Sequence, residues 1–209
     1  GYKRDYLVEA GLAVVREDGT LADRFYNRVM FPIHSISGRV VAFGGRILVN
    51  DKNKQKYVNT RETEIYVKNR IVYGLFFAKQ EITKQKKCYL VEGYTDVISM
   101  HQAGIENVVA SCGTSLTSGQ INMIKRFTDN LTIIYDGDEA GQNASVKGID
   151  LILKEGMKVK IVALPPDEDP DSFAKSHTKQ EIEDYITDHE EDFITYKSKK
   201  LKDVAGKYI

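Results

Sequence analysis

Four short runs of consecutive apolar residues divide the middle of the chain. They lie at 88–91, 108–110, 131–135 and 159–163, and stretches with apolar residues at helical spacing separate them at 95–103, 118–127 and 140–155. Short apolar strands that alternate with amphipathic helices are typical of βαβ units, in which helices cover both faces of a mainly parallel sheet. The pattern therefore predicts an α/β domain over residues 78–168.

The preceding segment, residues 1–77, has a different pattern in which short apolar runs mix with turn residues. The runs at 28–33 and 40–43 predict a pair of strands joined by a turn. Two glycines, Gly44 and Gly45, are expected to bend the chain before an extended run at 46–49. This segment is predicted to form a smaller α+β subdomain.

The last segment, residues 169–209, is rich in lysine and glutamate. Its apolar side chains recur at helical spacing, which predicts one or two amphipathic helices that lead out of the domain. These side chains are Ile182, Tyr185, Ile186, Phe193 and Ile194.

Charge is distributed unevenly along the chain, although the formal net charge is zero. Residues 1–90 hold 17 Lys and Arg against 9 Asp and Glu, whereas residues 91–209 hold 13 against 21. A basic first half suggests a polyanionic partner, and an acidic second half suggests bound cations. A chance distribution of solvated charges is the alternative.

The composition excludes several classes of protein. The chain has 209 residues, of which 42% are hydrophobic, which is typical of a globular protein with a sizeable core. Neither an apolar run of about 18 residues nor a signal peptide is present, so no membrane association is expected. The chain has two cysteines, Cys88 and Cys112, and four scattered histidines, so a structural zinc site is not expected. We expect a reduced, cytoplasmic protein.

Carboxylates follow three of the four predicted strands at their carboxyl ends. Glu92 follows the first strand, Asp136 and Asp138 follow the third, and Asp169 and Asp171 lie beyond the fourth. A parallel sheet would gather them at one edge, where ligands bind in such folds. Oxygen-only clusters suit Mg²⁺ or Mn²⁺, which can orient a hydroxyl and neutralise a triphosphate. Helix capping is the alternative for Asp136 or Asp138, but the matching positions of all five favour a metal site.

Basic and glycine-rich stretches are candidate anion sites. Arg46 follows two glycines, so its backbone can approach a ligand closely, and its planar guanidinium suits phosphate. The sequence has two readings for Lys52, Lys54 and Lys56. Their positive charges contact the phosphates of a nucleic-acid backbone, or they lie on a solvated loop without a binding role. Residues 113–115 present backbone amides to an anion or cap the helix that begins at 118, and the sequence leaves both readings open.

Two strings resemble the signature motifs of a Toprim domain, Val91-Glu92-Gly93-Tyr94-Thr95-Asp96-Val97 and Tyr135-Asp136-Gly137-Asp138-Glu139-Ala140-Gly141. Longer strings resemble the bacterial DnaG-type primases, at 28–33, 38–46, 56–60, 73–75 and 113–117. The resemblance runs from about residue 20 to about residue 175. It implies a Toprim-type, mainly parallel sheet flanked by helices, a smaller basic α+β amino-terminal subdomain and a helical tail. The implied activity is DNA-directed synthesis of RNA primers during replication.

The resemblance also implies roles for the acidic residues. Glu92 corresponds to the family's glutamate, which holds metal or acts as general base on the primer 3′-hydroxyl. Asp136 and Asp138 correspond to its metal ligands, and Asp169 and Asp171 to a second acidic pair. Asp96 is expected to pack or cap near the metal rather than bind it.

Basic residues of the first segment correspond to groups that contact nucleotide or template. Arg46 and Lys56 match the family's motifs directly, and Arg28 lies in one of the matching strings. Lys68 and Arg70 match less closely, because this sequence has Lys-Asn-Arg where the family often has Lys-Gly-Arg.

The resemblance further implies cofactors and partners. These are Mg²⁺ or Mn²⁺ without zinc, single-stranded DNA, ribonucleoside triphosphates and, through the parent protein, the replicative helicase and single-strand-binding protein. A cytoplasmic, nucleoid-associated location is expected. The chain begins at Gly1 and carries neither the family's zinc-binding module nor its helicase-interacting domain, so we expect an excised piece with weak activity. Another Toprim protein, such as a metal-dependent nuclease or a recombination mediator, is the alternative.

Overall fold

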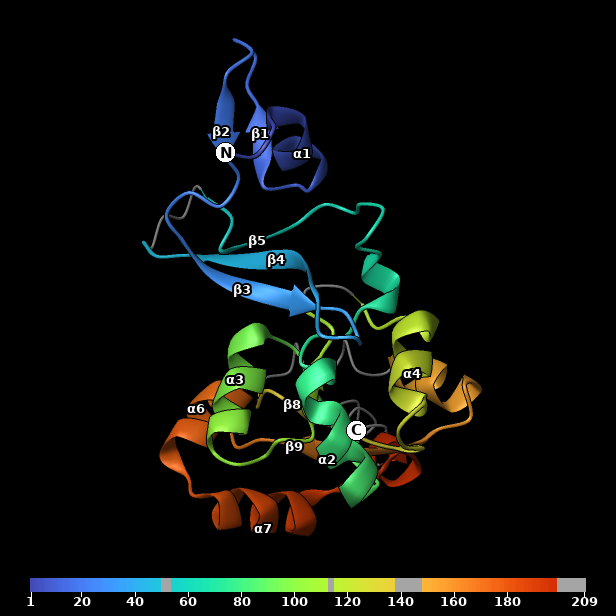
Figure 1. Ribbon diagram of the computed structural model, residues 1–209. Coiled ribbons are helices and arrows are strands. Elements are labelled where there is room, and N and C mark those ends of the chain that lie inside the picture. The colour runs from blue at the N-terminus through green and yellow to red at the C-terminus, as the bar shows by residue number, and fades with distance from the viewer. Residues whose placement is uncertain (50–53, 113–114, 138–147, 199–209) are drawn as a thin grey trace, which may run out of the picture. The chain divides into compact units, whose positions relative to one another are not determined.

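The computed structural model describes residues 1–49, 54–112, 115–137 and 148–198. The chain forms two compact units that divide between Ile71 and Val72 (Figure 1). The predicted segment boundaries after residues 77 and 168 stay predictions.

The first unit contains two small antiparallel sheets and two short helices. β1 and β2 form one sheet, and β3, β4 and β5 form the other in that order. The predicted strands at 28–33 and 40–43 are confirmed as β3 and β4. The elements are α1 (Arg4–Glu9), β1 (Ala13–Val15), β2 (Leu21–Asp23), β3 (Arg28–His34), β4 (Val40–Ile47), β5 (Tyr57–Asn59) and the 3₁₀ helix η1 (Lys68–Arg70).

The predicted bend at Gly44 and Gly45 is wrong, because β4 continues through both glycines to Ile47. Gly44 pairs with Phe31 on β3, and both glycines keep partners on β5. A Cβ atom on Gly45 would lie 2.7 Å from Cδ1 of Phe25. Close packing against the Phe25 ring, rather than a turn, therefore explains this glycine.

The second unit is built on a five-stranded sheet in the order β10-β9-β8-β6-β7. β9, β8, β6 and β7 are parallel, and only the short edge strand β10 runs antiparallel among the described strands of this sheet. All four residues of β6 are buried, as expected for a strand covered on both faces. The predicted mainly parallel sheet is confirmed. Its strands are β6 (Cys88–Val91), β7 (Val108–Ala110), β8 (Asn130–Tyr135), β9 (Lys158–Ala163) and β10 (Glu191–Asp192).

Helices connect and flank these strands. The predicted helices at 95–103 and 118–127 are confirmed as α3 and α4, and the described part of the predicted helix at 140–155 is helical from 148 to 154. The named helices are α2 (Leu75–Gln85), α3 (Tyr94–Gln102), α4 (Ser118–Lys125), α6 (Pro170–Ser176) and α7 (Lys179–His189). No helix in the described ranges has the length and hydrophobicity needed to cross a bilayer.

The prediction that the helices of the last segment lead out of the domain is wrong for α6 and α7, because both helices pack against the second unit. Phe173 on α6 and Ile182 and Ile186 on α7 are buried in the same apolar cluster as α3 and the sheet. The chain after α7 then pairs with β9 as β10. The apolar stripe of α7 is therefore buried in this core. α6, which follows β9 along the chain and is buried in the same core through Phe173, lies beside the carboxyl edge of the sheet.

Candidate active site

Three neighbouring strands of the second unit are followed by carboxylates. β9, β8 and β6 lie side by side, with Leu90 beside Ile133 and Ile133 beside Ile161. Glu92 comes directly after β6 and Asp136 directly after β8, whereas Asp169 and Asp171 follow β9 at the start of α6. The parallel register therefore brings all four to the same edge of the sheet. Asp138 lies outside the described residues.

A fixed turn carries Glu92. The carbonyl oxygen of Glu92 accepts a hydrogen bond from the Cys112 backbone N–H at 3.2 Å. The next N–H, that of Gly93, donates to Oδ2 of Asp96 at 2.7 Å. Asp96 is 8% exposed and caps α3, as expected, so the Glu92 side chain projects from a backbone held on both sides.

The end of β8 is bound to the loop that follows β9. The Gly137 N–H donates to the carbonyl of Glu168 at 2.9 Å, and the Leu164 N–H donates to the carbonyl of Tyr135 at 3.2 Å. A Cβ atom on Gly137 would lie 2.0 Å from the carbonyl oxygen of Pro165. Only glycine allows this approach, which aligns Asp136 with the loop that carries the second acidic pair.

The second acidic pair has structural contacts of its own. Asp169 is the N-cap of α6, and its Oδ1 accepts a hydrogen bond from the Ser172 N–H at 2.7 Å. Asp171 accepts from the Ser99 hydroxyl through Oδ1 and from Lys175 Nζ through Oδ2, the latter at 2.7 Å. Both residues thus lie at the acidic edge while also stabilising α6.

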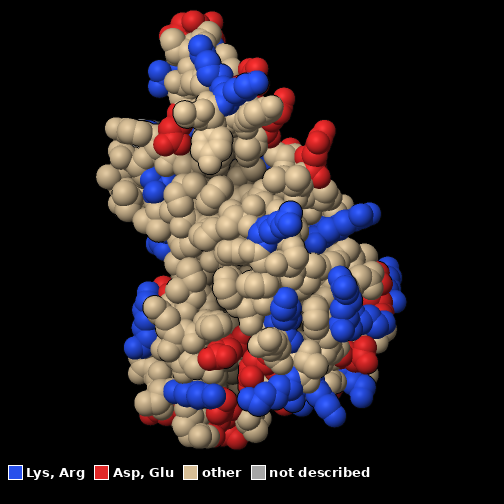
Figure 2. Space-filling model, viewed as in Figure 1, with Lys and Arg blue, Asp and Glu red and all other residues tan. Residues whose placement is uncertain are grey.

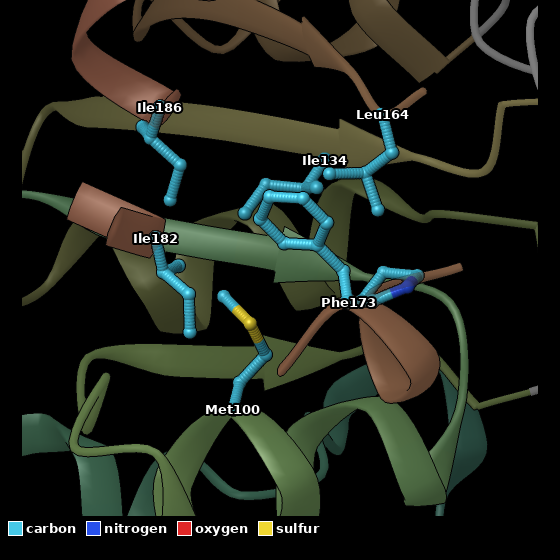
Figure 3. Close-up of a pocket in the computed structure, with 7 residues that line it drawn as sticks. Met100, Ile134, Leu164, Phe173, Ile182 and Ile186 are labelled. Carbon is cyan, nitrogen blue, oxygen red and sulfur yellow. The ribbon is translucent and has the colours of Figure 1, made fainter. Parts of the chain in front are cut away.

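Apolar side chains packed beneath α6 fix that helix to the sheet. Figure 3 shows the Phe173 ring beside Ile134 and Leu164, with the Met100 side chain pointing towards it. Ile182 and Ile186 close the other side. Burial of this ring against strand and helix side chains therefore holds the start of α6, and with it Asp169 and Asp171, at the carboxyl edge.

The electrostatic coupling of the edge is visible at Asp96. The pKa of Asp96 is raised to about 6, mainly by burial and also by the negative charges of Asp169, Asp171 and Glu92, against the lowering effect of the Gly93 hydrogen bond. These carboxylates therefore share one electrostatic environment. Among the residues that the structure describes, no three His, Cys, Asp or Glu side chains converge closely enough to hold one ion.

Charges of both signs lie on the visible face of the second unit, although this unit has an acidic edge. Figure 2 shows Lys and Arg side chains intermingled with Asp and Glu over the visible face of this unit. The net negative charge of the second half of the sequence is therefore not spread as a uniform acidic surface.

Basic candidates in the first unit have different environments. Arg46 on β4 pairs with Val29 on β3 and with Tyr57 on β5, so the three side chains stand in a row on one face. The Arg46 guanidinium carbon lies 5.7 Å from the centroid of the Tyr57 ring. Lys56 is exposed next to this row. In contrast, Arg28 Nη1 donates to the backbone carbonyls of Gly45 at 3.1 Å and Lys56 at 3.3 Å.

The remaining candidates are less organised. Lys68 and Arg70 belong to η1, and the Lys68 backbone N–H donates to Oε1 of Glu62 at 3.1 Å. Lys52, Gly113 and Thr114 lie outside the described residues. The N-cap of α4 is Thr117, whose Oγ1 accepts from the Gln120 N–H at 3.2 Å, so both readings of residues 113–115 stay predictions.

Three residues of the site are not found by reasoning from the sequence alone. Tyr57 shares a sheet face with Arg46 only through the β4–β5 register. Ser99 reaches Asp171 from another helix, 72 residues away in sequence. Lys175 has a local signal, since it stands four residues after Asp171 on one helix.

The second unit thus has the fold and the acidic edge of a Toprim domain. Residues 89–174 match the family described as Toprim-like, and residues 1–79 match the DNA primase catalytic core, N-terminal domain. The chain is 44% identical over 180 residues to a DNA primase of Clostridium acetobutylicum, which covers 86% of this chain and 30% of that protein. It is 41% identical over 183 residues to the DNA primase of Escherichia coli K12, which covers 86% of this chain and 31% of that protein.

Solved structures agree with these matches. A DNA primase domain from Pseudomonas aeruginosa superimposes with a TM-score of 0.89 at 36% identity, over 96% of this chain and 64% of that chain. A DnaG primase catalytic domain bound to single-stranded DNA has a TM-score of 0.80 at 40% identity, over 88% of this chain and 60% of that one. The chain belongs to the DnaG-type DNA primase family and matches part of its catalytic core. It spans about 30% of the length of the curated relatives.

Proposed function

We propose that this chain is the part of a replicative primase that joins ribonucleotides into RNA primers on single-stranded DNA. The primases that it matches cover both of its units, and one of them is described as bound to single-stranded DNA. The observation that carries the proposal is the set of carboxylates on three neighbouring strand ends of a Toprim fold. Nucleotidyl transfer needs such a set, because its reactants are polyanionic.

The donor set fits a hard divalent cation such as Mg²⁺ or Mn²⁺. Toprim domains of primases generally depend on a divalent metal, and the ligands proposed here are carboxylate oxygens. We propose Glu92, Asp136 and Asp138 as ligands, with Asp169 and Asp171 as a second pair. When bound, the cation neutralises charge on the triphosphate and makes the primer 3′-hydroxyl more acidic.

The chain's own residues orient the reactants and move the proton. Glu92 is exposed on a turn whose backbone is held by Cys112 and Asp96. This restricts its carboxylate to positions close to the carboxyl edge of the sheet. In that position Glu92 can accept the proton of the 3′-hydroxyl as a general base. Asp136, bound to the loop after β9 through Gly137, holds the second side of the same site.

The first unit supplies binding groups for nucleotide or template. Arg46 presents a planar set of N–H donors that matches phosphate, and the Tyr57 ring beside it offers a face for a base. Lys56 adds charge, and Lys68 and Arg70 are proposed as weaker contacts. Because the Arg28 guanidinium already donates to two backbone carbonyls, its proposed contribution is to hold β4 and β5 in place for Arg46.

Further partners follow from the proposed role in replication. We propose that the replicative helicase and single-strand-binding protein act through the parent protein. The proposed location is the cytoplasm, in association with the nucleoid.

The test is RNA synthesis from labelled ribonucleotides on single-stranded DNA with Mg²⁺ or Mn²⁺. The parent protein and this chain are compared with their Glu92→Gln and Asp136→Asn variants, and Glu106→Gln, an exposed carboxylate away from the edge, is the matched control. We expect both edge variants to lose at least about 100-fold in rate, the size expected for a lost general base, and to keep the wild-type fold. The control should keep the wild-type rate.

The opposite results are equally informative. Wild-type synthesis by folded Glu92→Gln and Asp136→Asn variants would remove both residues from the site. A parent protein that cleaves the DNA, or only binds it, without making RNA would favour the nuclease or the mediator.

A further inference from the structure

A lysine side chain lies on the acidic edge. Lys175 Nζ is 2.7 Å from Oδ2 of Asp171, and the two residues are separated by one turn of α6. The Lys175 side chain is 64% exposed, whereas that of Asp171 is 20% exposed. An ammonium group is therefore paired with one of the carboxylates proposed to face a divalent cation.

Both carboxylate oxygens of Asp171 have partners in this arrangement. Oδ1 accepts a hydrogen bond from the hydroxyl of Ser99, which is 5% exposed on α3, and Oδ2 accepts from Lys175. A divalent cation that coordinates Asp171 would share the carboxylate with these partners and would be repelled by the Lys175 ammonium. Ser99 is buried and fixed, whereas Lys175 is a mostly exposed side chain with a flexible stem, so Lys175 is the partner that can leave.

Asp169, the other member of the pair, differs in this respect. Its Oδ1 caps α6 through Ser172, and its side chain forms no ion pair within the described residues. The two carboxylates of the second pair therefore have different partners before a metal ion binds. Asp169 is held by a backbone N–H, while Asp171 is held by the Ser99 hydroxyl and by an exposed ammonium group.

We propose that Lys175 is an internal counter-cation that competes with a divalent metal ion for Asp171. This inference rests on the proposed function, since it takes the acidic edge as the metal site. In the absence of metal, Lys175 partly neutralises an edge where several carboxylates repel one another. A metal ion at Asp171 would be repelled by the Lys175 ammonium unless the lysine side chain swings away, so the lysine lowers the metal affinity of the second acidic pair. Lys175 is thus a positioning residue that tunes the site without touching the substrate.

The test measures Mn²⁺ binding directly, by calorimetric titration of the full chain at low and moderate salt. Lys175→Met removes the charge and keeps the length of the side chain, and Lys175→Gln is a second neutral variant. Lys175→Arg keeps the charge. Lys179→Met is the matched control, because Lys179 forms an i,i+4 pair with Glu183 on α7 at 3.7 Å.

We expect the two neutral variants to bind Mn²⁺ roughly 3- to 10-fold more tightly than the wild type at low salt, as expected for removal of a like charge a few ångströms from a cation near solvent. The gain should shrink as salt is added. Lys175→Arg and Lys179→Met should keep the wild-type affinity. Thermal unfolding of each variant verifies that the fold is retained.

Each contrary outcome has a distinct meaning. If the wild type binds Mn²⁺ and Asp136→Asn abolishes binding, but the neutral Lys175 variants bind no more tightly, the counter-cation inference is overturned and the proposed metal site stands. If the wild type binds no Mn²⁺, the metal site of the proposed function fails and the inference fails with it.

Discussion

Asp96 is the residue at which the effect of the acidic edge on the free energy of unfolding can be measured. It is nearly buried and lies within the field of Glu92, Asp169 and Asp171, and its contact with the Gly93 N–H offsets only part of that effect. Its pKa is raised to about 6, first by burial and then by these charges. The folded protein therefore keeps this carboxyl protonated at pH values where the unfolded chain has lost the proton.

The stability of the protein should depend on pH through this residue. Between about pH 4 and pH 6 the folded state holds one more proton than the unfolded state, so the free energy of unfolding falls as pH rises through this window. The raised pKa corresponds to a total loss of about 3 kcal/mol, complete above pH 6. Urea unfolding of the wild type and of Asp96→Asn, which keeps an acceptor for Gly93, measures this difference at each pH.

Asp188→Asn, on the exposed side of α7, controls for a general change in charge. The Asp96 variant should become more stable than the wild type only as pH rises towards 6, and the control should not. Parallel pH profiles for wild type and Asp96→Asn would show that the carboxyl does not carry the proton difference.

Residue types at the edge are readable from the sequence, but their contacts are not. The strand-end positions of Glu92 and Asp136 follow from a local apolar pattern that the structure bears out. The hydrogen bond from Ser99 to Asp171 and the row formed by Arg46 and Tyr57 depend on how separate elements pack. No periodicity along one segment encodes such pairings, because they are set by tertiary structure.

At the scale of elements, the loop after β9 decides where the second acidic pair stands. This loop is bound to the end of β8 by the Gly137 N–H, and the Gly137 Cα packs against Pro165. Glycine is needed here for space rather than for an unusual backbone angle, since its Cβ would meet backbone atoms that cannot rotate away. The close spacing of the end of β8 and the loop after β9 therefore depends on the absence of a Cβ atom at Gly137.

Gly137→Ala should force these two loops apart. We expect the free energy of unfolding to fall by about 1–3 kcal/mol, the usual cost of an overpacked position, and Mn²⁺ affinity to fall as Asp136 moves from Asp169. Gly148→Ala is the matched control, because a Cβ atom there meets nothing within 4 Å and position 148 is helical. That control should be neutral or more stable by up to about 1 kcal/mol. Equal stability and metal affinity for both variants would mean that the loops tolerate the methyl group.

The elements themselves show where sequence patterns suffice. The apolar runs of the parallel strands are long enough and regular enough to define β6, β7, β8 and β9. The pattern is misleading at Gly44 and Gly45, where close packing mimics a turn signal, and at α7, where an amphipathic face is equally consistent with a helix that leaves the domain and one that packs back on it. Length and composition of a single element cannot distinguish these cases, since the surface that buries the element comes from elsewhere in the chain.

At the scale of the whole molecule, the two compact units carry different kinds of binding group. The described candidates for phosphate and base contacts are in the first unit, and the carboxylates proposed for metal are in the second. If both units serve one reaction, template binding and metal binding should respond to different substitutions. Residues 1–79 and residues 89–174 match two different family models, the DNA primase catalytic core N-terminal domain and a Toprim-like domain.

Arg46→Ala should weaken single-stranded DNA binding without changing Mn²⁺ affinity. The substitution removes the proposed phosphate contact and the guanidinium beside the Tyr57 ring, so we expect roughly a 5- to 30-fold loss, equivalent to about 1–2 kcal/mol. The slope of log affinity against log salt should fall by about 0.7, as expected for one phosphate contact on a single strand. Fluorescence anisotropy on a labelled oligonucleotide, repeated over a range of salt concentrations, measures both quantities.

Arg39→Ala is the control for net charge, because Arg39 is exposed in the turn between β3 and β4 on the same unit. Its affinity and salt slope should stay near those of the wild type, and Asp136→Asn should show the reverse behaviour of Arg46→Ala by losing Mn²⁺ and retaining DNA. An Arg46→Ala variant that binds DNA with the wild-type slope would remove Arg46 from the template contact. A variant that loses Mn²⁺ together with DNA would instead mean that Arg46 also affects metal binding.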